Sequence, residues 1–168
     1  MGSRQGQPIS EKRIFSIGTS TRSLDEFMSL LRQYRIETVA DVRSFPTSRF
    51  EHFGRDTFER SLEEFGFCYV YLGSKLGGFR RGGYEKYMGT PHYREGLSKL
   101  AKIGSASVTT FVCAERLPWR CHRRWIGKSL MGEGWEVIHI VDERRTWRPR
   151  EFLTGTQGKR AKGMSRET

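Results

Sequence analysis

The chain of 168 residues lacks the long apolar run that a membrane-spanning helix needs. Such a helix takes about 20 consecutive apolar residues, and no stretch approaches that length or resembles the apolar part of a secretory signal. Only three cysteines are present, an odd number in no pattern typical of a secreted disulfide framework. We therefore expect a soluble cytoplasmic protein with no membrane partner.

Nucleotide-binding glycine motifs are also missing. The chain has neither a GxGxxG sequence nor the lysine-containing phosphate loop, so we expect no nucleotide cofactor and predict no cofactor of any other kind. No internal repeat is present, and the length suits one domain whose core needs no disulfide. Mean hydropathy is low at −0.64, but eleven Phe, four Trp and six Tyr supply large core side chains.

Acidic residues are scarce relative to basic ones. Nineteen Asp and Glu stand against thirty Lys and Arg, which gives a net charge of +11. Residues 143–168 carry eight of the basic residues and three Glu, so the basic excess is not confined to the C-terminal end. A basic body with a basic tail is expected of a polyanion binder, most simply a nucleic-acid binder, although generic solubility is an alternative. We predict DNA rather than RNA as the partner and leave the oligomeric state open.

Apolar runs alternate with segments of helical periodicity along the chain. Five strands are predicted, at residues 14–18, 38–43, 67–72, 107–112 and 136–141. The alternation predicts a three-layer Rossmann-like or flavodoxin-like α/β fold, with a mostly parallel five-stranded sheet and helices on both faces. We expect a disordered N-terminal segment, one α/β domain and a basic tail, at residues 1–12, 13–145 and 146–168.

Capping residues and glycines predict several local boundaries. Three helices are predicted from their capping residues, and Gly104 is expected to lie just past the end of the last one. Residues 73–84 are rich in glycine and basic residues and are predicted to form a mobile loop. The helix starts are marked by Ser23 with Glu26, Asp56 with Glu59, and Thr90 before Pro91.

Reactive side chains are densest in residues 113–124, between the fourth strand and a helix expected to begin near Cys121. A thiol at a helix start, beside His122 and Arg123, is biased towards thiolate. Cys113 could face Cys121 across the loop, so a nucleophile, a redox pair and a packing role all stay open. The spacing of Cys113, Cys121 and His122 matches no paired metal-binding pattern, and we predict no metal site.

Ligands of open α/β sheets bind where the carboxyl ends of strands meet. A flavodoxin-like order would bring the turn after Gly18, Asp41 and the Cys113 loop into one crevice. Asp41 and Glu115 could then work as general acid and base, or they could pair with neighbouring arginines. The candidate catalytic residues are Asp41, Glu115, Cys121 and His122.

The candidate substrate-binding residues come from the same loops. The turn after Gly18 can offer backbone N–H groups to a phosphate, and rings among basic residues can stack on unpaired bases or close the edge of a core. His139, inside a strand, is typical of a satisfied core histidine. The substrate-binding candidates are Gly18, Ser20, Arg22, Arg43, Ser48, Arg49, Gly77, Gly78, Phe79, Cys113, Arg116, Trp119 and Arg123.

Five short motifs occur along the chain: Ile17-Gly18-Thr19-Ser20, Asp41-Val42-Arg43 with Pro46, Ser48 and Arg49, Leu76-Gly77-Gly78, Cys113 with Glu115 and Cys121-His122-Arg123, and Val137-Ile138-His139-Ile140. Together they resemble the domain-of-unknown-function family 488, over nearly all of residues 13–145. The resemblance implies a small three-layer α/β domain with a site at the CxE…CHR block, and it implies no particular reaction. At Thr19 many members carry His, and the basic tail lies outside the shared region.

Three functions are compatible with these features. The leading hypothesis is a DNA-repair hydrolase, of the glycosylase or nuclease type, that grips phosphates with arginines and uses Asp41 or Glu115 at a damaged base or at the backbone. The second is a thiol enzyme that acts on a small anionic substrate through Cys121 or Cys113. The third is an adaptor that binds nucleic acid without catalysis.

Overall fold

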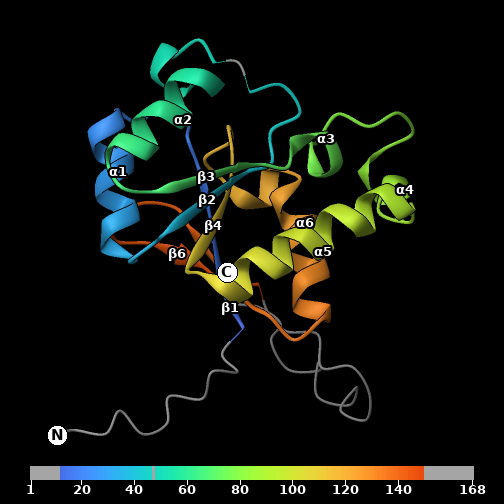
Figure 1. Cartoon of the computed structure of the whole chain (residues 1–168). Helices are drawn as coiled ribbons and strands as arrows, with labels where there is room; N and C mark the ends of the chain where they lie inside the picture. The colour runs from blue at the N-terminus through green and yellow to red at the C-terminus, as the bar shows by residue number, and fades with distance from the viewer. Residues whose placement is uncertain (1–11, 47, 150–168) are drawn as a thin grey trace, which may run out of the picture.

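A single six-stranded sheet forms the centre of the computed structural model, which describes residues 12–46 and 48–149. The strand order is β3-β2-β4-β1-β5-β6, and every neighbouring pair is parallel except β5 and β6 (Figure 1). The mostly parallel α/β sheet predicted from the sequence is confirmed. The strands are β1 (Arg13–Gly18), β2 (Thr38–Asp41), β3 (Cys68–Tyr71), β4 (Thr109–Cys113), β5 (Glu136–Ile140) and β6 (Thr146–Trp147).

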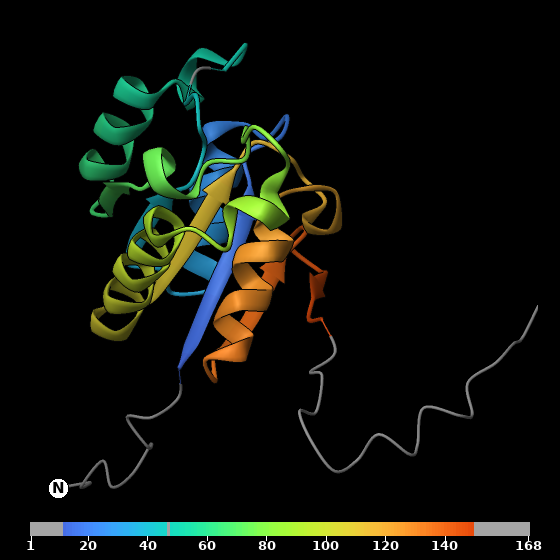
Figure 2. The same ribbon diagram turned by 90° about the vertical axis from the view of Figure 1, so that its right-hand side faces the viewer.

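Helices cover both faces of the sheet because its crossovers run in two directions. The chain moves towards the β3 edge through α1 (Leu24–Gln33) and α2 (Arg55–Glu64), and back through α5 (Pro91–Ala106) and α6 (Arg123–Gly132). Right-handed crossovers in opposite directions place their helices on opposite faces, and Figure 2 shows α5 and α6 in front of the sheet. The connections hold η1 (Glu51–Phe53), α3 (Gly73–Leu76), α4 (Tyr84–Tyr87) and η2 (Pro118–Arg120).

Strand β4 lies between β1 and β2, so the order differs in detail from the 2-1-3-4-5 order of flavodoxin. Strands β1 and β4 are still neighbours, and Gly18 is in register with Cys113. The turn after Gly18 rests on the start of the next loop, since the backbone N–H of Thr19 donates to the Cys113 carbonyl at 2.8 Å. These two segments therefore meet as the sequence predicted.

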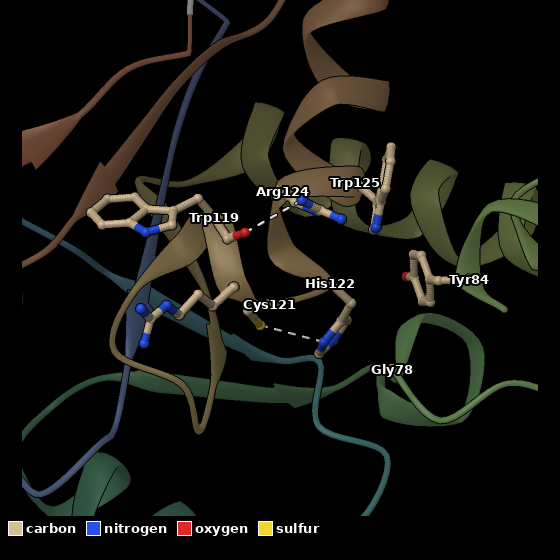
Figure 3. A pocket seen from close by; sticks show the side chains of 8 residues that line it. Gly78, Tyr84, Trp119, Cys121, His122, Arg124 and Trp125 are labelled. Carbon is tan, nitrogen blue, oxygen red and sulfur yellow. Dashed lines mark hydrogen bonds between the residues drawn. The ribbon is translucent and has the colours of Figure 1, made fainter.

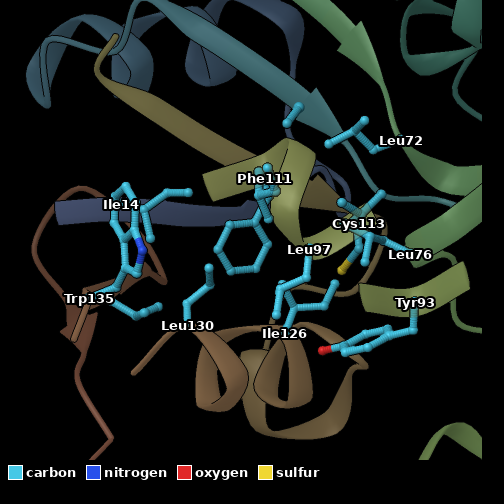
Figure 4. Packing of buried hydrophobic residues seen from close by; sticks show 14 of the residues in the cluster. Ile14, Leu72, Leu76, Tyr93, Leu97, Phe111, Cys113, Ile126, Leu130 and Trp135 are labelled. Atoms are coloured by element: carbon cyan, nitrogen blue, oxygen red, sulfur yellow. The ribbon is translucent and has the colours of Figure 1, made fainter. Parts of the chain in front are cut away.

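Two apolar layers separate the sheet from its helices. Because successive strand residues point to opposite faces, Phe111 and Cys113 pack beneath α5 and α6, while Val112 packs beneath α1 and α2. Figure 4 shows Cys113 beside Leu97 of α5 and Ile126 of α6. The Cys113 side chain thus belongs to the α6 face of the sheet.

Some predicted boundaries are confirmed and others are wrong. The Ser23 hydroxyl accepts from the Glu26 backbone N–H, and Thr90 caps α5 in the same way. Helix α2 instead begins after Gly54 without a side-chain cap, and α5 continues through Gly104. The predicted loop at residues 73–84 contains α3 and the start of α4, because Leu76 and Tyr84 bury their side chains.

The C-terminal edge of the sheet extends beyond the expected domain boundary at residue 145. Thr146 and Trp147 form β6 and pair with β5, so the first residues of the expected tail belong to the sheet. Residues 1–11 and 150–168, most of the expected terminal segments, lie outside the described residues. Among the described helices, none combines the length and the apolar character needed to cross a membrane.

Candidate functional site

A cavity of about 260 Å³ opens beside the N-terminal end of α6, above the carboxyl ends of the strands (Figure 3). Its walls come from the glycine-rich segment around α3, from α4, and from the loop between β4 and α6. Figure 3 shows the Cys121 sulfur turned towards the His122 ring, with the Tyr84 and Trp125 rings further along the wall. The cavity is lined by Gly78, Tyr84, Cys121, His122, Arg124 and Trp125, together with Trp119 and Arg120.

Two reduced cysteines meet at the edge of this cavity. Cys113 ends β4 and is almost completely buried, whereas Cys121 follows η2 and is partly exposed. The two Sγ atoms are 2.7 Å apart. The loop between β4 and α6 therefore folds back on itself and brings its two thiols into direct contact, with Cys121 on the side of the cavity.

A fully buried guanidinium supports the cysteine pair from below. Arg123 donates from Nε to the Cys113 sulfur at 2.8 Å, from Nη1 to the Ser16 hydroxyl at 2.9 Å, and from Nη2 to the Glu115 carbonyl at 2.5 Å. Its backbone N–H also faces the Cys121 sulfur at 3.5 Å. The acceptors that surround its side chain are thus sulfur, a hydroxyl and backbone carbonyls.

The charge of Arg123 requires a counter-charge, because an isolated buried ion is very costly. Among its acceptors, only the cysteine pair can supply a negative charge, as one thiolate that shares the remaining proton. The hydrogen bond from Cys113, with further help from His122 and Arg123, lowers the pKa of Cys121. Burial raises the pKa of Cys113, which keeps the shared proton. The lowered pKa favours Cys121 as the sulfur that carries the charge of the pair, and Cys121 is the one that lines the cavity.

His122 is oriented towards Cys121 by a backbone carbonyl. Its Nε2 lies 2.9 Å from the Val42 carbonyl, which can only accept, so Nε2 carries the proton. The other nitrogen, Nδ1, lies 3.4 Å from the Cys121 sulfur. His122 can therefore exchange a proton with Cys121 through Nδ1. This is the arrangement of a base, a nucleophile and an orienting group that activates cysteine nucleophiles.

Glycines at two positions allow the loops to approach this closely. A Cβ atom on Gly78 would lie 2.8 Å from His122 Nδ1, and one on Gly18 would lie 1.9 Å from the Glu115 carbonyl oxygen. Both distances are too short for a side chain. Gly78 of the Leu76-Gly77-Gly78 segment thus covers the His122 ring, and Gly18 permits the contact between the β1 turn and the cysteine loop.

A second buried group fixes Arg123 from the sheet side. The Ser16 hydroxyl accepts from Arg123 and forms a short hydrogen bond with Nδ1 of His139, a strand-β5 residue that is fully buried. Burial, with Arg123 nearby, lowers the pKa of His139 to about 3, so the imidazole is neutral. Ser16 therefore donates to His139 and accepts from Arg123, and it connects β1 with β5 beneath the thiols.

Ser16→Ala should lower the free energy of unfolding by about 1–3 kcal/mol, because a buried Arg123 N–H and His139 Nδ1 both lose their partner. The matched control is Thr110→Val, since the Thr110 hydroxyl is buried without a partner among the described residues. That change should be neutral or stabilising. Urea unfolding of both variants is the measurement. Equal changes in the free energy of unfolding would show that the Ser16 hydrogen bonds do not stabilise the fold.

Asp41 does not lie in the cavity, contrary to the predicted catalytic role, and instead pairs with an arginine, which is the alternative that the sequence also left open. It is in register with Val112, so its side chain points to the α1 and α2 face, away from Cys113. Its carboxylate is fully buried and accepts from Nε and Nη2 of Arg43, each at 2.8 Å, and from the Tyr69 hydroxyl at 2.6 Å. Asp41 and Arg43 therefore form a buried ion pair, and neither is free to bind substrate.

Other predicted residues have structural partners close to the site. Glu115 is exposed, and its carboxylate accepts from the Leu117 backbone N–H within its own loop. Arg22 is buried and donates to the carbonyls of Gly18 and Val141, and burial lowers its pKa to about 10. These contacts hold the β1 turn and the cysteine loop in place.

The remaining candidates lie nearer the surface. Trp119 packs edge-on against Trp147 at 5.5 Å between ring centroids, and Figure 3 shows its indole directed away from Trp125. Arg49 and Phe79 are exposed, and Arg116 is partly buried. The other three make local contacts: the Ser20 N–H donates to the Ala114 carbonyl, the Ser48 hydroxyl accepts from the Phe50 N–H, and Gly77 packs on Ser44.

Several site residues were missed by the sequence reasoning. Ser16 is the one hydroxyl in the buried run of residues 14–18, and His139 lies in a buried strand as well, which is the signal that could have paired them. Tyr84, Arg124 and Trp125 line the cavity but carry no recognisable motif. Within residues 12–46 and 48–149, no group of three His, Cys, Asp or Glu side chains could hold a metal ion.

Comparison with known proteins gives one match. No curated protein and no solved structure matches the chain. A family model described as domain of unknown function DUF488 matches residues 23–130, which run from the cap of α1 to the last buried turn of α6 and include both site cysteines. The match is narrower than the expected span of 13–145, but it covers more than half of the sequence. The chain therefore belongs to the DUF488 family.

Proposed function

We propose that this protein is a thiol enzyme that acts on an anionic substrate, with Cys121 as its nucleophile. One observation carries the proposal. The fully buried guanidinium of Arg123 contacts a pair of touching cysteines, and none of the acceptors of its side chain is a carboxylate. A thiolate is therefore the counter-charge, and the thiolate lies at an open cavity.

Each residue of the site then has a defined role. Cys121, as the thiolate, attacks the electrophilic atom of the substrate while the bond from that atom to the departing group breaks, and the departing group takes up the proton held on His122 Nδ1. Water then cleaves the new bond to sulfur, which releases the product and restores Cys121 and His122. Cys113 and Arg123 stabilise the thiolate between turnovers. Arg124 is exposed at the mouth of the cavity, with its guanidinium over the Trp125 ring, and can pair with an anionic group of the substrate.

The geometry supports this function better than acid–base hydrolysis of DNA by Asp41 or Glu115. Asp41 is fully buried and its oxygens are occupied by Arg43 and Tyr69. Glu115 caps its own loop and does not line the cavity. Cys121 and His122 both do, and they are already in contact.

Iodoacetamide alkylation as a function of pH tests the proposal, with each cysteine followed by peptide mass spectrometry on the reduced native protein. The rate for Cys121 should stay nearly constant between about pH 6 and 8, because only the thiolate reacts and it is already formed. Cys68 is exposed and serves as the internal control. Its rate should rise with pH, since alkylation needs the thiolate. A Cys121 rate that rises in parallel with the Cys68 rate would overturn the proposal.

A further inference from the structure

We infer that the substrate of this site is a single strand of nucleic acid, whose bases stack on an exposed pair of phenylalanines beside the cavity. The inference names the substrate class for the proposed thiol chemistry and rests on that function for the reaction alone. The binding surface itself is carried by separate contacts, which involve Phe45, Phe79 and the arginines around them.

Phe45 and Phe79 are far more exposed than aromatic side chains in a folded core. Phe45 is 69 % and Phe79 is 80 % exposed, yet their ring centroids are only 5.8 Å apart. The two rings come from different loops, after β2 and after α3, and the Phe79 backbone N–H donates to the Ser44 hydroxyl at 3.2 Å. The backbone thus holds two open ring faces together at the surface.

This aromatic pair is connected to the thiol site through both of its loops. Gly78, next to Phe79, packs against the His122 ring and lines the cavity. On the other side, Val42 lies three residues before Phe45, and its carbonyl holds His122 Nε2. A ligand stacked on the pair is therefore adjacent to the cavity that exposes Cys121.

Exposed arginines follow both phenylalanines in the sequence and also line the cavity. Arg81 follows Phe79 in sequence by two residues, and Arg49 follows Phe45 by four, and both are exposed. Across the cavity, Arg120 and Arg124 are also exposed. The chain as a whole carries +11. The phosphates of a nucleic-acid strand, which are spaced every few ångströms, could pair with arginines distributed in this way.

Rings together with arginines favour unpaired bases over other anionic partners. Proteins that bind single strands combine a positive groove with aromatic side chains on which bases stack. A duplex keeps its bases stacked inside, so it could use the arginines but not the rings. A second copy of this chain would bring the same positive charge to the surface and be repelled. An acidic peptide would pair with the arginines and leave both rings bare.

Fluorescence anisotropy tests this inference by measuring the binding of labelled 12-mers of oligothymidine and oligouridine and of a duplex of equal length. Phe45→Ala and Phe79→Ala each remove an exposed ring, so the fold should be kept. Each should weaken single-strand binding at least about fivefold. Phe65→Ala is the control, because Phe65 is also exposed (44 %) but packs under Arg32 at the end of α2. It should bind like the unchanged protein.

Equal binding by the unchanged protein and both phenylalanine variants would overturn the inference, as would tighter binding of the duplex. A preference for DNA or for RNA agrees with it equally. As a second readout, a bound 12-mer should slow alkylation of Cys121 but not of Cys68. The two proposals fail separately. Ring-dependent binding by a protein with an ordinary Cys121 thiol would remove only the enzymatic proposal, and a reactive Cys121 with ring-independent binding would remove only this one.

Discussion

Asp41→Asn should lower the free energy of unfolding by about 3–5 kcal/mol, the usual cost of removing one partner of a buried ion pair. The Asp41 carboxylate takes two hydrogen bonds from the Arg43 side chain and one from the Tyr69 hydroxyl, at 2.6–2.8 Å. Asparagine offers one oxygen in place of two and no charge. The Arg43 guanidinium, only 5 % exposed, would keep its charge without a counter-ion.

Urea unfolding measures this effect, and Asp25→Asn is the matched control, because Asp25 lies exposed in the first turn of α1. The control should lose no more than the few tenths of a kcal/mol that a carboxylate contributes at a helix N-terminus. The folded Asp41→Asn protein should alkylate at Cys121 with an unchanged pH profile. A variant as stable as the unchanged protein would mean that the carboxylate has another role, including the catalytic one predicted from the sequence.

Arg123→Met should slow alkylation of Cys121 at pH 6 by about 100-fold. The hydrogen bond from Cys113, followed by His122 and the charge of Arg123, lowers the pKa of Cys121, so the thiolate persists as the pH falls until that lowered pKa is reached. Methionine fills similar space without charge, and the pKa should return towards about 8.5, where less than about 1 % of a thiol is ionised at pH 6. The variant rate should then rise about tenfold per pH unit.

Arg124→Met is the control for Arg123→Met, because Arg124 is exposed and contacts Trp119 and Trp125 rather than a sulfur. Its Cys121 profile should stay flat. Circular dichroism and urea unfolding establish that Arg123→Met is folded, and the conservative Arg123→Lys variant should recover part of the reactivity because it restores a positive charge. If Arg123→Met alkylates as fast as the unchanged protein at pH 6, Arg123 is not the counter-ion of the thiolate.

The sequence predicted the α/β fold, because the alternation of strands and helices is a local pattern, and it singled out the cysteine loop as the candidate site. It did not predict which side chains share a face at the carboxyl edge. Asp41 and Cys113 each end a strand, but Asp41 is in register with Val112, one residue before Cys113. Since side chains alternate along a strand, that single step places the carboxylate and the thiol on opposite faces. Register of this kind is set by packing across the sheet, not by motif.

The support beneath the thiols was hidden for a related reason. Ser16 and His139 are 123 residues apart, and no sequence pattern in either strand predicts the hydrogen bond between them. For the same reason, the sequence could not tell which arginines are buried and which line the cavity. Arg22, Arg43 and Arg123 are buried, whereas Arg120 and Arg124 line the cavity. Sequence indicates that arginines gather near a site, but burial decides which of them hold the loops and which meet a ligand.

The separation of these contacts along the chain has a consequence for folding. Cys113 and Cys121 are eight residues apart, but Arg123 is fixed by Ser16, 107 residues away. Chains dominated by such distant contacts tend to fold slowly, and an unfolded chain keeps the two cysteines near each other without the buried guanidinium. In that state Cys121 is an ordinary thiol. The fraction of molecules whose Cys121 is alkylated rapidly at mildly acidic pH therefore equals the fraction in which the central sheet has formed. Alkylation of this residue can thus be used to follow refolding.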